Sequence, residues 1–107
     1  IKKEDKEFNA KSDVFFYRPH LEISPDHDIV KCLEESYVEI FDKTPQLIGA
    51  TYWMDSALLA RAGIPTVIFG PSGEGAHSAV EYVELDSVIK TAEVLANTII
   101  KFCDEKC

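Results

Sequence analysis

The chain has 107 residues, a formal net charge of −8 and a sequence pI near 4.7. This length allows one domain at most, and the acidic balance argues against a nucleic acid or an anionic membrane as partner, because both attract basic surfaces. No apolar run approaches the roughly 18 residues that cross a bilayer, and the lysine-rich start lacks the hydrophobic stretch of a signal peptide, so we expect a cytoplasmic location.

The amino-terminal part of the chain predicts a linker followed by one helix. Residues 1–12 are polar and charged apart from Ile1, Phe8 and Ala10, and they predict a linker or the end of a preceding element. Residues 14–17 form a short β-prone run that Pro19 stops. Ser24 and Pro25 form a helix-start signal, because serine can cap an orphan N–H group and proline fits the first helical position. Apolar residues then recur at three- and four-residue steps, which predicts an amphipathic helix over residues 25–43.

Asp26, His27 and Asp28 are residue types that bind metals, and they stand together at the start of this helix. Adjacent positions on a helix point in different directions, so these side chains do not converge easily on one ion. We therefore favour the interpretation that these residues belong to the first turn of the helix, where the two aspartates stabilise the helix dipole.

The middle of the chain predicts a strand, a short helix and a second strand. Residues 47–52 and 66–69 are apolar and prone to strand formation, and residues 56–62 between them favour helix. Asp55 is expected to cap this helix, and Gly63 to end it in the left-handed conformation. So short a connection predicts a right-handed crossover with the two strands parallel.

A glycine-rich loop that presents His77 follows the second strand. Gly73 and Gly75 permit positive φ angles, and a neutral imidazole is the commonest metal ligand in proteins. Ligands of open α/β sheets lie beyond the carboxyl ends of such strands, so His77 is a candidate metal ligand. A loop histidine without metal and a phosphate-binding loop are the alternatives, although a phosphate loop would lead directly into a helix.

The final helix is predicted over residues 86–104, with Asp86 as its cap.

The three cysteines are odd in number and have no spacing typical of a disulfide framework. The sequence therefore predicts reduced thiols.

The second half of the chain resembles the carboxyl-terminal end of the M20 family of zinc aminoacylases and peptidases, which includes acetylornithine deacetylase and succinyl-diaminopimelate desuccinylase. The resemblance rests on four short motifs: Ala-Gly-Ile-Pro-Thr-Val at 62–67, Gly-Pro at 70–71, Ala-His at 76–77 and Glu-Tyr-Val at 81–83. It extends upstream through Asp55-Ser56-Ala57, where relatives usually show Thr-Asp-Ala, and covers nearly the whole chain.

Two positions depart from the family pattern. Met54 replaces a small hydroxyl residue that lies near the substrate carboxylate in relatives, which leaves that contact open. Ser-Ala-Val at 78–80 replaces the commoner Thr-Pro-Asp, a change we expect to affect only the loop.

The resemblance implies that the complete protein hydrolyses an amide bond in an N-acyl amino acid or a small peptide. It implies two divalent metals, zinc or alternatively cobalt, with His77 as a ligand of one of them. The family's other ligand motifs are absent from these 107 residues, so we expect them in a missing amino-terminal half of the same enzyme. His77 would then be a single weak ligand here, with no catalytic residue in this chain. Thr51, Asp55, Gly73 and Gly75 are candidates for lining the substrate pocket.

The expected fold class is α/β, as part of a three-layer αβα arrangement with a parallel sheet. Residues 1–18 would end a preceding lid-domain element, and residues 19–107 would form the carboxyl-terminal portion of the catalytic domain. A non-catalytic α/β module that self-associates, for example as a homodimer, is the alternative, because a strand edge and apolar helix faces would otherwise stay uncovered.

Overall fold

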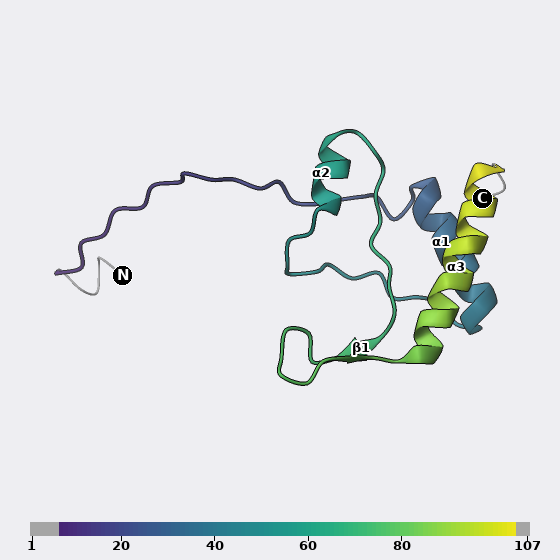
Figure 1. Ribbon diagram of the computed structural model, residues 1–107. Helices are drawn as coiled ribbons and strands as arrows, with labels where there is room; N and C mark the ends of the chain where they lie inside the picture. The colour runs from purple at the N-terminus through teal and green to yellow at the C-terminus, as the bar shows by residue number, and fades with distance from the viewer. Residues whose placement is uncertain (1–6, 105–107) are drawn as a thin grey trace.

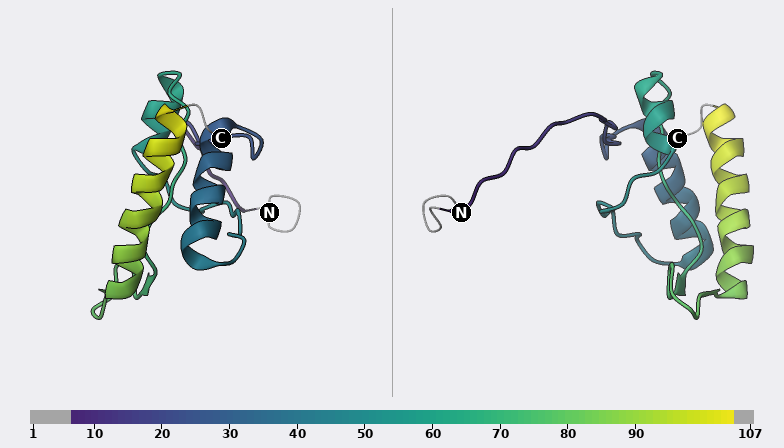
Figure 2. Two further views of the ribbon diagram at one scale, coloured as in Figure 1. Left: turned by 90° about the vertical axis from the view of Figure 1, so that its right-hand side faces the viewer. Right: turned by 60° about the vertical axis from the view of Figure 1, so that its left-hand side comes forward.

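The computed structural model describes residues 7–104, and its packed part is a pair of helices. Helices α1 and α3 lie side by side, whereas the chain before α1 leaves the body as an extended arm (Figures 1 and 2). The elements in chain order are α1 (Asp28–Phe41), α2 (Ser56–Arg61), β1 (Gly73–Glu74), β2 (Tyr82–Val83) and α3 (Leu85–Cys103).

The arrangement is open. The Cα radius of gyration is 19.4 Å, whereas a compact domain of 100 residues has about 13 Å. The chain exposes 9029 Å², and a compact protein of its mass, 12.0 kDa, would expose about 6,000 Å². Many large apolar side chains are therefore exposed, and the buried positions lie mainly where α1 meets α3.

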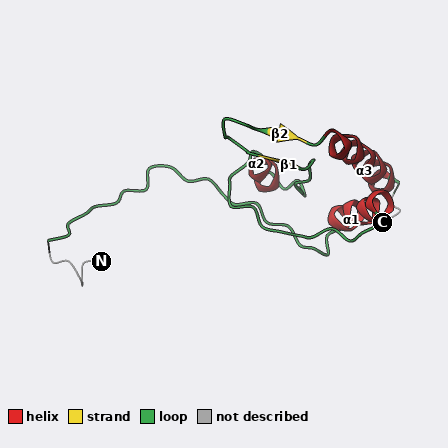
Figure 3. Cartoon of the chain, turned by 90° about the horizontal axis from the view of Figure 1, so that it is seen from below, coloured by secondary structure: helices red, strands yellow, loops and turns green. Residues whose placement is uncertain are grey.

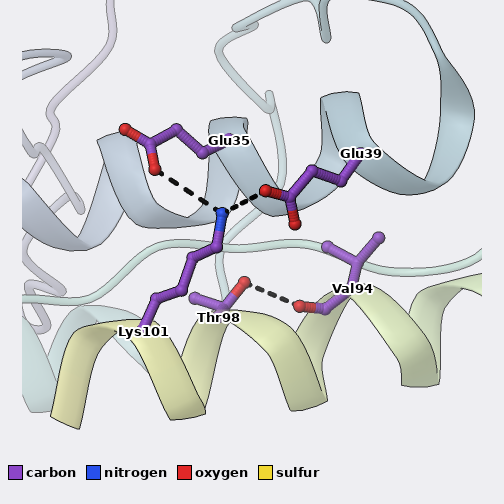
Figure 4. A network of polar contacts seen from close by, with 5 residues as sticks. All are labelled: Glu35, Glu39, Val94, Thr98 and Lys101. Atoms are coloured by element: carbon purple, nitrogen blue, oxygen red, sulfur yellow. Dashed lines mark hydrogen bonds and ion pairs between the residues drawn. The ribbon is translucent and has the colours of Figure 1, made fainter. Parts of the chain in front are cut away.

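Small side chains form the contact between α1 and α3. Cys32 and Ser36 of α1 and Val94 of α3 are fully buried there, and Thr98 of α3 is 5% exposed. The Thr98 hydroxyl donates a hydrogen bond of 2.7 Å to the Val94 carbonyl oxygen of its own helix, so its polar atom is satisfied inside the contact (Figure 4). Small residues on both helices permit this close packing.

A lysine at the edge of this contact joins the two helices electrostatically. Lys101 Nζ of α3 lies 2.7 Å from Glu39 Oε1 and 3.6 Å from Glu35 Oε2, which both belong to α1 (Figure 4). The two glutamates are four residues apart and therefore share one helix face. The hydrogen bond to Glu39 raises the pKa of Lys101 above its ordinary value of 10.5, against an opposing effect of desolvation.

Substitution of Lys101 with methionine is expected to lower the free energy of unfolding of the complete protein by about 0.2–1 kcal/mol near neutral pH, the range for exposed pairs. Because the folded-state pKa of Lys101 is raised, this contribution is fully present below the unfolded-state pKa and is lost as the pH rises through the folded-state pKa. Thermal unfolding between pH 7 and pH 11, with Lys31→Met as the control, measures the difference. A stability loss that does not shrink toward alkaline pH would contradict the ion-pair explanation.

The predicted helix over residues 25–43 exists, but it begins three residues later. Ser24 forms a turn in place of the expected cap, because its carbonyl oxygen accepts from the His27 N–H (3.0 Å) and its hydroxyl oxygen from the Asp26 N–H (3.2 Å). His27 is the N-cap of α1, and its Nδ1 accepts a hydrogen bond of 3.2 Å from the Ile29 N–H. Asp28 lies in the first turn, as predicted for a dipole-stabilising acid.

The other two helices also match the predicted type. Asp55 occupies the N-cap position of α2 without a side-chain cap bond. Gly63 ends this helix at φ 84°, as predicted, and the N–H groups of Gly63 and Ile64 donate to the carbonyl oxygens of Ala60 and Leu59. Helix α3 begins at Leu85 with Glu84 as N-cap, so the prediction of Asp86 as the cap is wrong by two residues.

The sheet within the described residues differs from the predicted pair of strands. It is antiparallel and two-stranded, with Gly73 opposite Val83 and Glu74 opposite Tyr82. Residues 47–52 and 66–69 have no regular secondary structure, because a strand requires a hydrogen-bonded neighbour and neither segment has one here. Phe69 nevertheless packs edge-on against Tyr37 of α1 with ring centroids 6.0 Å apart. The parallel sheet of a three-layer fold thus stays a prediction.

Two further sequence predictions concern the cysteines and the membrane. Cys103 is a free, exposed thiol, but Cys32 is disulfide-bonded, so the prediction of reduced thiols is wrong for Cys32; Cys107 lies outside the described residues. None of the helices within residues 7–104 is both long and apolar enough to cross a bilayer.

Candidate functional site

His77 lies in the loop of the hairpin formed by β1 and β2, which we call the His77 hairpin (residues 73–83). Figure 3 shows that β2 leads almost directly into α3. The hairpin extends sideways from the amino-terminal end of this helix (Figure 1). The candidate ligand is therefore attached to the longest helix of the chain, at 19 residues.

Two serines and a glutamate fix the base of the His77 hairpin to α3. The Glu84 N–H donates to the Ser72 carbonyl oxygen (2.9 Å), and the Ser72 hydroxyl donates to Glu84 Oε2 (3.0 Å). The Ser72 N–H donates to Ser87 Oγ (3.0 Å), and the Ser87 hydroxyl donates to the Glu84 carbonyl oxygen (2.6 Å). We call these three residues the base clamp. Since the bonds join both ends of the hairpin, they hold it closed where it enters the helix.

Both glycines of the hairpin are required by its backbone. A Cβ atom on Gly73 would collide with the Tyr82 carbonyl oxygen and would lie 2.9 Å from the Val83 Cα atom of the opposite strand. Gly75 has a φ of 77°, and a Cβ atom there would collide with the Val80 carbonyl oxygen. Any side chain at either position would therefore open the hairpin or displace its loop.

The His77 backbone adopts an uncommon conformation. Its φ is 62°, in the left-handed region that residues other than glycine rarely enter. The His77 N–H lies 3.4 Å from Glu81 Oε2, and the Ser78 N–H donates to the Gly75 carbonyl oxygen (2.8 Å), so local hydrogen bonds support this turn. Residues held in such conformations cluster at functional sites, where the surroundings impose them.

The His77 side chain is exposed and is free to bind a ligand. Its imidazole makes no hydrogen bond or ion pair to any residue between 7 and 104. Both ring nitrogens are therefore accessible, as a metal ligand requires, and the loop glycines leave room for the approach of a bound group. The donor type and the shape of the loop thus fit the predicted role.

His77 cannot form a catalytic metal site alone. No cluster of three or more His, Cys, Asp or Glu side chains in the described part of the chain could hold a metal ion. A catalytic zinc ion normally has three protein ligands and one open position. Any site that includes His77 must therefore draw its other ligands from elsewhere.

The predicted pocket residues fall into two groups. Gly73 and Gly75 belong to the His77 hairpin, where they shape the loop around the histidine. Thr51 and Asp55 are exposed and lie just before α2, and no hydrogen bond or ion pair joins either residue to His77 within residues 7–104. Helix α2 and the hairpin lie at opposite ends of the molecule (Figures 1 and 2). Of the four predicted pocket residues, only Gly73 and Gly75 therefore lie in the same hairpin as His77.

A cluster around Arg18 was not predicted from the sequence. The Arg18 Cζ atom lies over the Phe16 ring, 4.7 Å from its centroid, and over the Trp53 ring at 4.9 Å. The Trp53 indole N–H donates a hydrogen bond of 2.9 Å to the Pro19 carbonyl oxygen, which ties the arm to the segment before α2. The aromatic neighbours of Arg18 in the sequence were a signal for such a contact, but they could not identify its distant partner, Trp53.

Comparison with known proteins relates the chain to one hydrolase family. The sequence model of peptidase family M20/M25/M40 matches residues 9–101. The chain is 32% identical over 89 residues to the N-formyl-4-amino-5-aminomethyl-2-methylpyrimidine deformylase of Bacillus subtilis (strain 168), a match that covers 82% of this chain and 21% of the relative. It is also 32% identical over 93 residues to peptidase T of Geobacillus thermodenitrificans (strain NG80-2), covering 85% of this chain and 22% of the relative.

The chain therefore spans about a fifth of the length of the curated relatives it matches. No solved structure matches it significantly.

Proposed function

Because the chain belongs to peptidase family M20/M25/M40, we propose that the complete protein is a metal-dependent hydrolase that cleaves an amide bond in an N-acyl amino acid or a small peptide. The observation that carries this proposal is the exposed His77 imidazole on a hairpin closed by the base clamp. A metal ligand must be held in a fixed position, because displacement of a catalytic group by about 1 Å can lower the reaction rate 100-fold.

His77 would hold one of two divalent metals, which we propose to be zinc, with cobalt as the alternative. When bound, such metals polarise a scissile carbonyl group and lower the pKa of a water molecule. The hairpin would contribute the orientation of the imidazole, through Gly75 and the contact between Glu81 and the His77 N–H. The remaining ligands and the general base would come from the part of the protein outside this chain.

The names of the relatives support amide hydrolysis as the reaction class, but they do not agree on which acyl group is removed. One relative is named as a deformylase that acts on an N-formyl group, and another as a peptidase. In both cases the name describes removal of an acyl or peptidyl group from nitrogen. We therefore propose small acyl groups (formyl, acetyl and succinyl) and short peptides as the substrates to test first.

We also propose that residues 47–52 and 66–69 pair as parallel strands of a three-layer αβα domain in the complete protein. Both segments expose apolar side chains, with Ile48 exposed to 79% and Ile68 to 41%. Burial of such side chains would stabilise the domain by about 25 cal/mol per Å². The excess surface of this chain supports a larger surrounding fold.

The experiment is a hydrolysis assay with the complete protein. N-formyl, N-acetyl and N-succinyl amino acids and a set of dipeptides are incubated with protein that contains zinc or cobalt, before and after treatment with a chelator. We expect turnover of at least one amide, its loss with the chelator and its return with added metal. No turnover with either metal across the panel would contradict the proposal. The 107 residues alone are expected to be inactive, because they lack a three-ligand cluster in their described part.

A self-associating module is the second candidate, and the outer face of α3 favours it. Ile89, Ile99 and Ile100 are each about 60% exposed. Sedimentation of the complete protein distinguishes the two functions. A discrete homodimer without hydrolase activity would support the module, and a hydrolytically active monomer would exclude it.

A further inference from the structure

Ser87 is the central residue of the base clamp, which joins the His77 hairpin to α3. Its Oγ atom accepts a hydrogen bond of 3.0 Å from the Ser72 N–H, and its hydroxyl lies within hydrogen-bond distance of two carbonyl oxygens, that of Glu84 at 2.6 Å and that of Ser72 at 3.2 Å. Ser87 is partly buried, whereas Ser72 and Glu84 are exposed. One hydroxyl group therefore contacts both residues that flank the hairpin.

The polar side chains at the start of α3 bind the far end of the hairpin and do not cap the helix. Glu84 is the N-cap residue, yet its side chain makes no cap bond, and its Oε2 atom accepts from the Ser72 hydroxyl (3.0 Å). A polar side chain at a helix start normally satisfies one of the first N–H groups of its own helix. In α3 the acceptors of Glu84 and Ser87 instead receive bonds from Ser72, which lies 12 and 15 residues away in the sequence. These contacts therefore serve the placement of the hairpin.

A small rotation at the base clamp would displace His77 considerably. Within the described residues β1 and β2 pair only with each other, so their ladder does not fix the angle between the hairpin and α3. At about 3.3 Å per residue, the three residues 73–75 place His77 roughly 10 Å from the clamp, so that a rotation of about 6° would move the imidazole by about 1 Å. A displacement of that size is enough to impair a catalytic group.

We propose that Ser87 is a positioning residue of the metal site: its hydroxyl fixes the angle between the His77 hairpin and α3 and thereby places the imidazole for metal binding. This inference rests on the proposed function, since it takes the metal from that function. Ser87 would contact neither the metal nor the substrate, and it would act only through the position of His77.

The test compares Ser87→Ala with wild type in the complete protein. Titration with zinc in competition with a chelator measures the affinity, and the absorption spectrum of the cobalt-substituted protein reports the geometry of the metal ligands. We expect Ser87→Ala to bind one zinc ion about 10-fold more weakly, at the lower end of the effect of residues that orient a metal ligand. Its cobalt spectrum should differ from that of wild type.

Two variants serve as controls. Ser87→Thr keeps a hydroxyl group on the same carbon atom and should therefore retain the wild-type zinc affinity and cobalt spectrum. Ser56→Ala removes another serine hydroxyl from the first turn of a helix, α2, and Ser56 Oγ has no hydrogen-bond partner within the described residues. It should leave both measurements unchanged.

The double variant with Ser87→Ala and His77→Ala separates positioning from a general loss of stability. If Ser87 acts through His77, its substitution should cause no further loss of zinc affinity once the imidazole is absent. A loss of the same size in both backgrounds would show that Ser87 serves only the fold.

Two further outcomes would overturn the inference: a Ser87→Ala variant with wild-type zinc affinity and cobalt spectrum, and a loss of affinity that Ser87→Thr shares. The variants also keep the two proposals apart. Zinc binding that depends on His77 but is unchanged in Ser87→Ala refutes this inference alone. Zinc binding that depends on both residues, without hydrolysis of any amide, refutes only the hydrolase. Unchanged zinc affinity in His77→Ala refutes the metal site and this inference together.

Discussion

Replacement of His77 with alanine in the complete protein is expected to reduce kcat/KM for metal-dependent amide hydrolysis about 1,000-fold. The estimate follows from the several kcal/mol that a catalytic metal contributes to transition-state stabilisation, at about 1.4 kcal/mol for each tenfold change in rate. The His77 ring is exposed and has no hydrogen-bond partner within residues 7–104. Its removal should therefore leave the thermal stability of the metal-free protein within about 0.5 kcal/mol of wild type.

His20→Ala is the matched control for this substitution. His20 is also exposed, and its Nε2 atom lies 3.4 Å from a carboxylate oxygen of Glu22, away from the His77 hairpin. We expect wild-type kinetics and metal content for the His20 variant. Equal activity of the His77 and His20 variants, in steady-state assays at saturating metal, would remove His77 from the active site.

Substitution of Gly75 with alanine is expected to cost at least about 100-fold in activity, although the added methyl group carries no chemistry. The new Cβ atom would collide with the Val80 carbonyl oxygen and lie 2.8 Å from Ser78 Oγ, and an L-residue at φ 77° is strained in any case. The loop would have to shift, and a displacement of about 1 Å at a catalytic group can cost 100-fold. Metal affinity should fall together with kcat.

Gly70→Ala provides the control within the same glycine-rich segment. A Cβ atom on Gly70 meets nothing within 4 Å, and Gly70 has no positive φ. We expect this variant to retain activity and metal affinity. If Gly75→Ala behaved like Gly70→Ala in both measurements, the shape of the loop would not be what positions His77.

The helices of this chain were predictable because their signals are local. The recurrence of apolar residues over 25–43 and 86–104 predicted α1 and α3 within three residues at each end. The start of α1 was missed because Ser24 directs both its hydroxyl and its carbonyl oxygen to a preceding turn, so that His27 became the cap. Propensity alone does not show which of two nearby polar residues takes the cap.

The His77 hairpin was predicted only as a loop. Its strands have two residues each, which is too short for an alternation pattern in the sequence. Its closure depends on Ser72, Glu84 and Ser87, whose contacts join positions 12 to 15 residues apart. Serines and a glutamate near the start of a helix favour capping, but the sequence does not show that they also close a hairpin.

For the predicted strands over 47–52 and 66–69 the sequence signal is clear, but the described residues form no strand there. Their composition favours strands, yet a strand forms only with a neighbour that satisfies its backbone. That neighbour is not among the described residues, and a contact such as the one between Phe69 and Tyr37 orients the chain without forming a ladder. The Arg18 cluster shows the same dependence on distant residues, because Trp53 lies 35 positions away from Arg18.

The central claim is that His77 holds a catalytic metal, and the number of tightly bound zinc ions tests it most directly. Elemental analysis of the complete protein after dialysis against a dilute zinc buffer should give two zinc ions per chain for wild type and for His20→Ala. The same measurement should give one fewer for His77→Ala. Equal zinc content in all three proteins would contradict the assignment of His77 as a metal ligand.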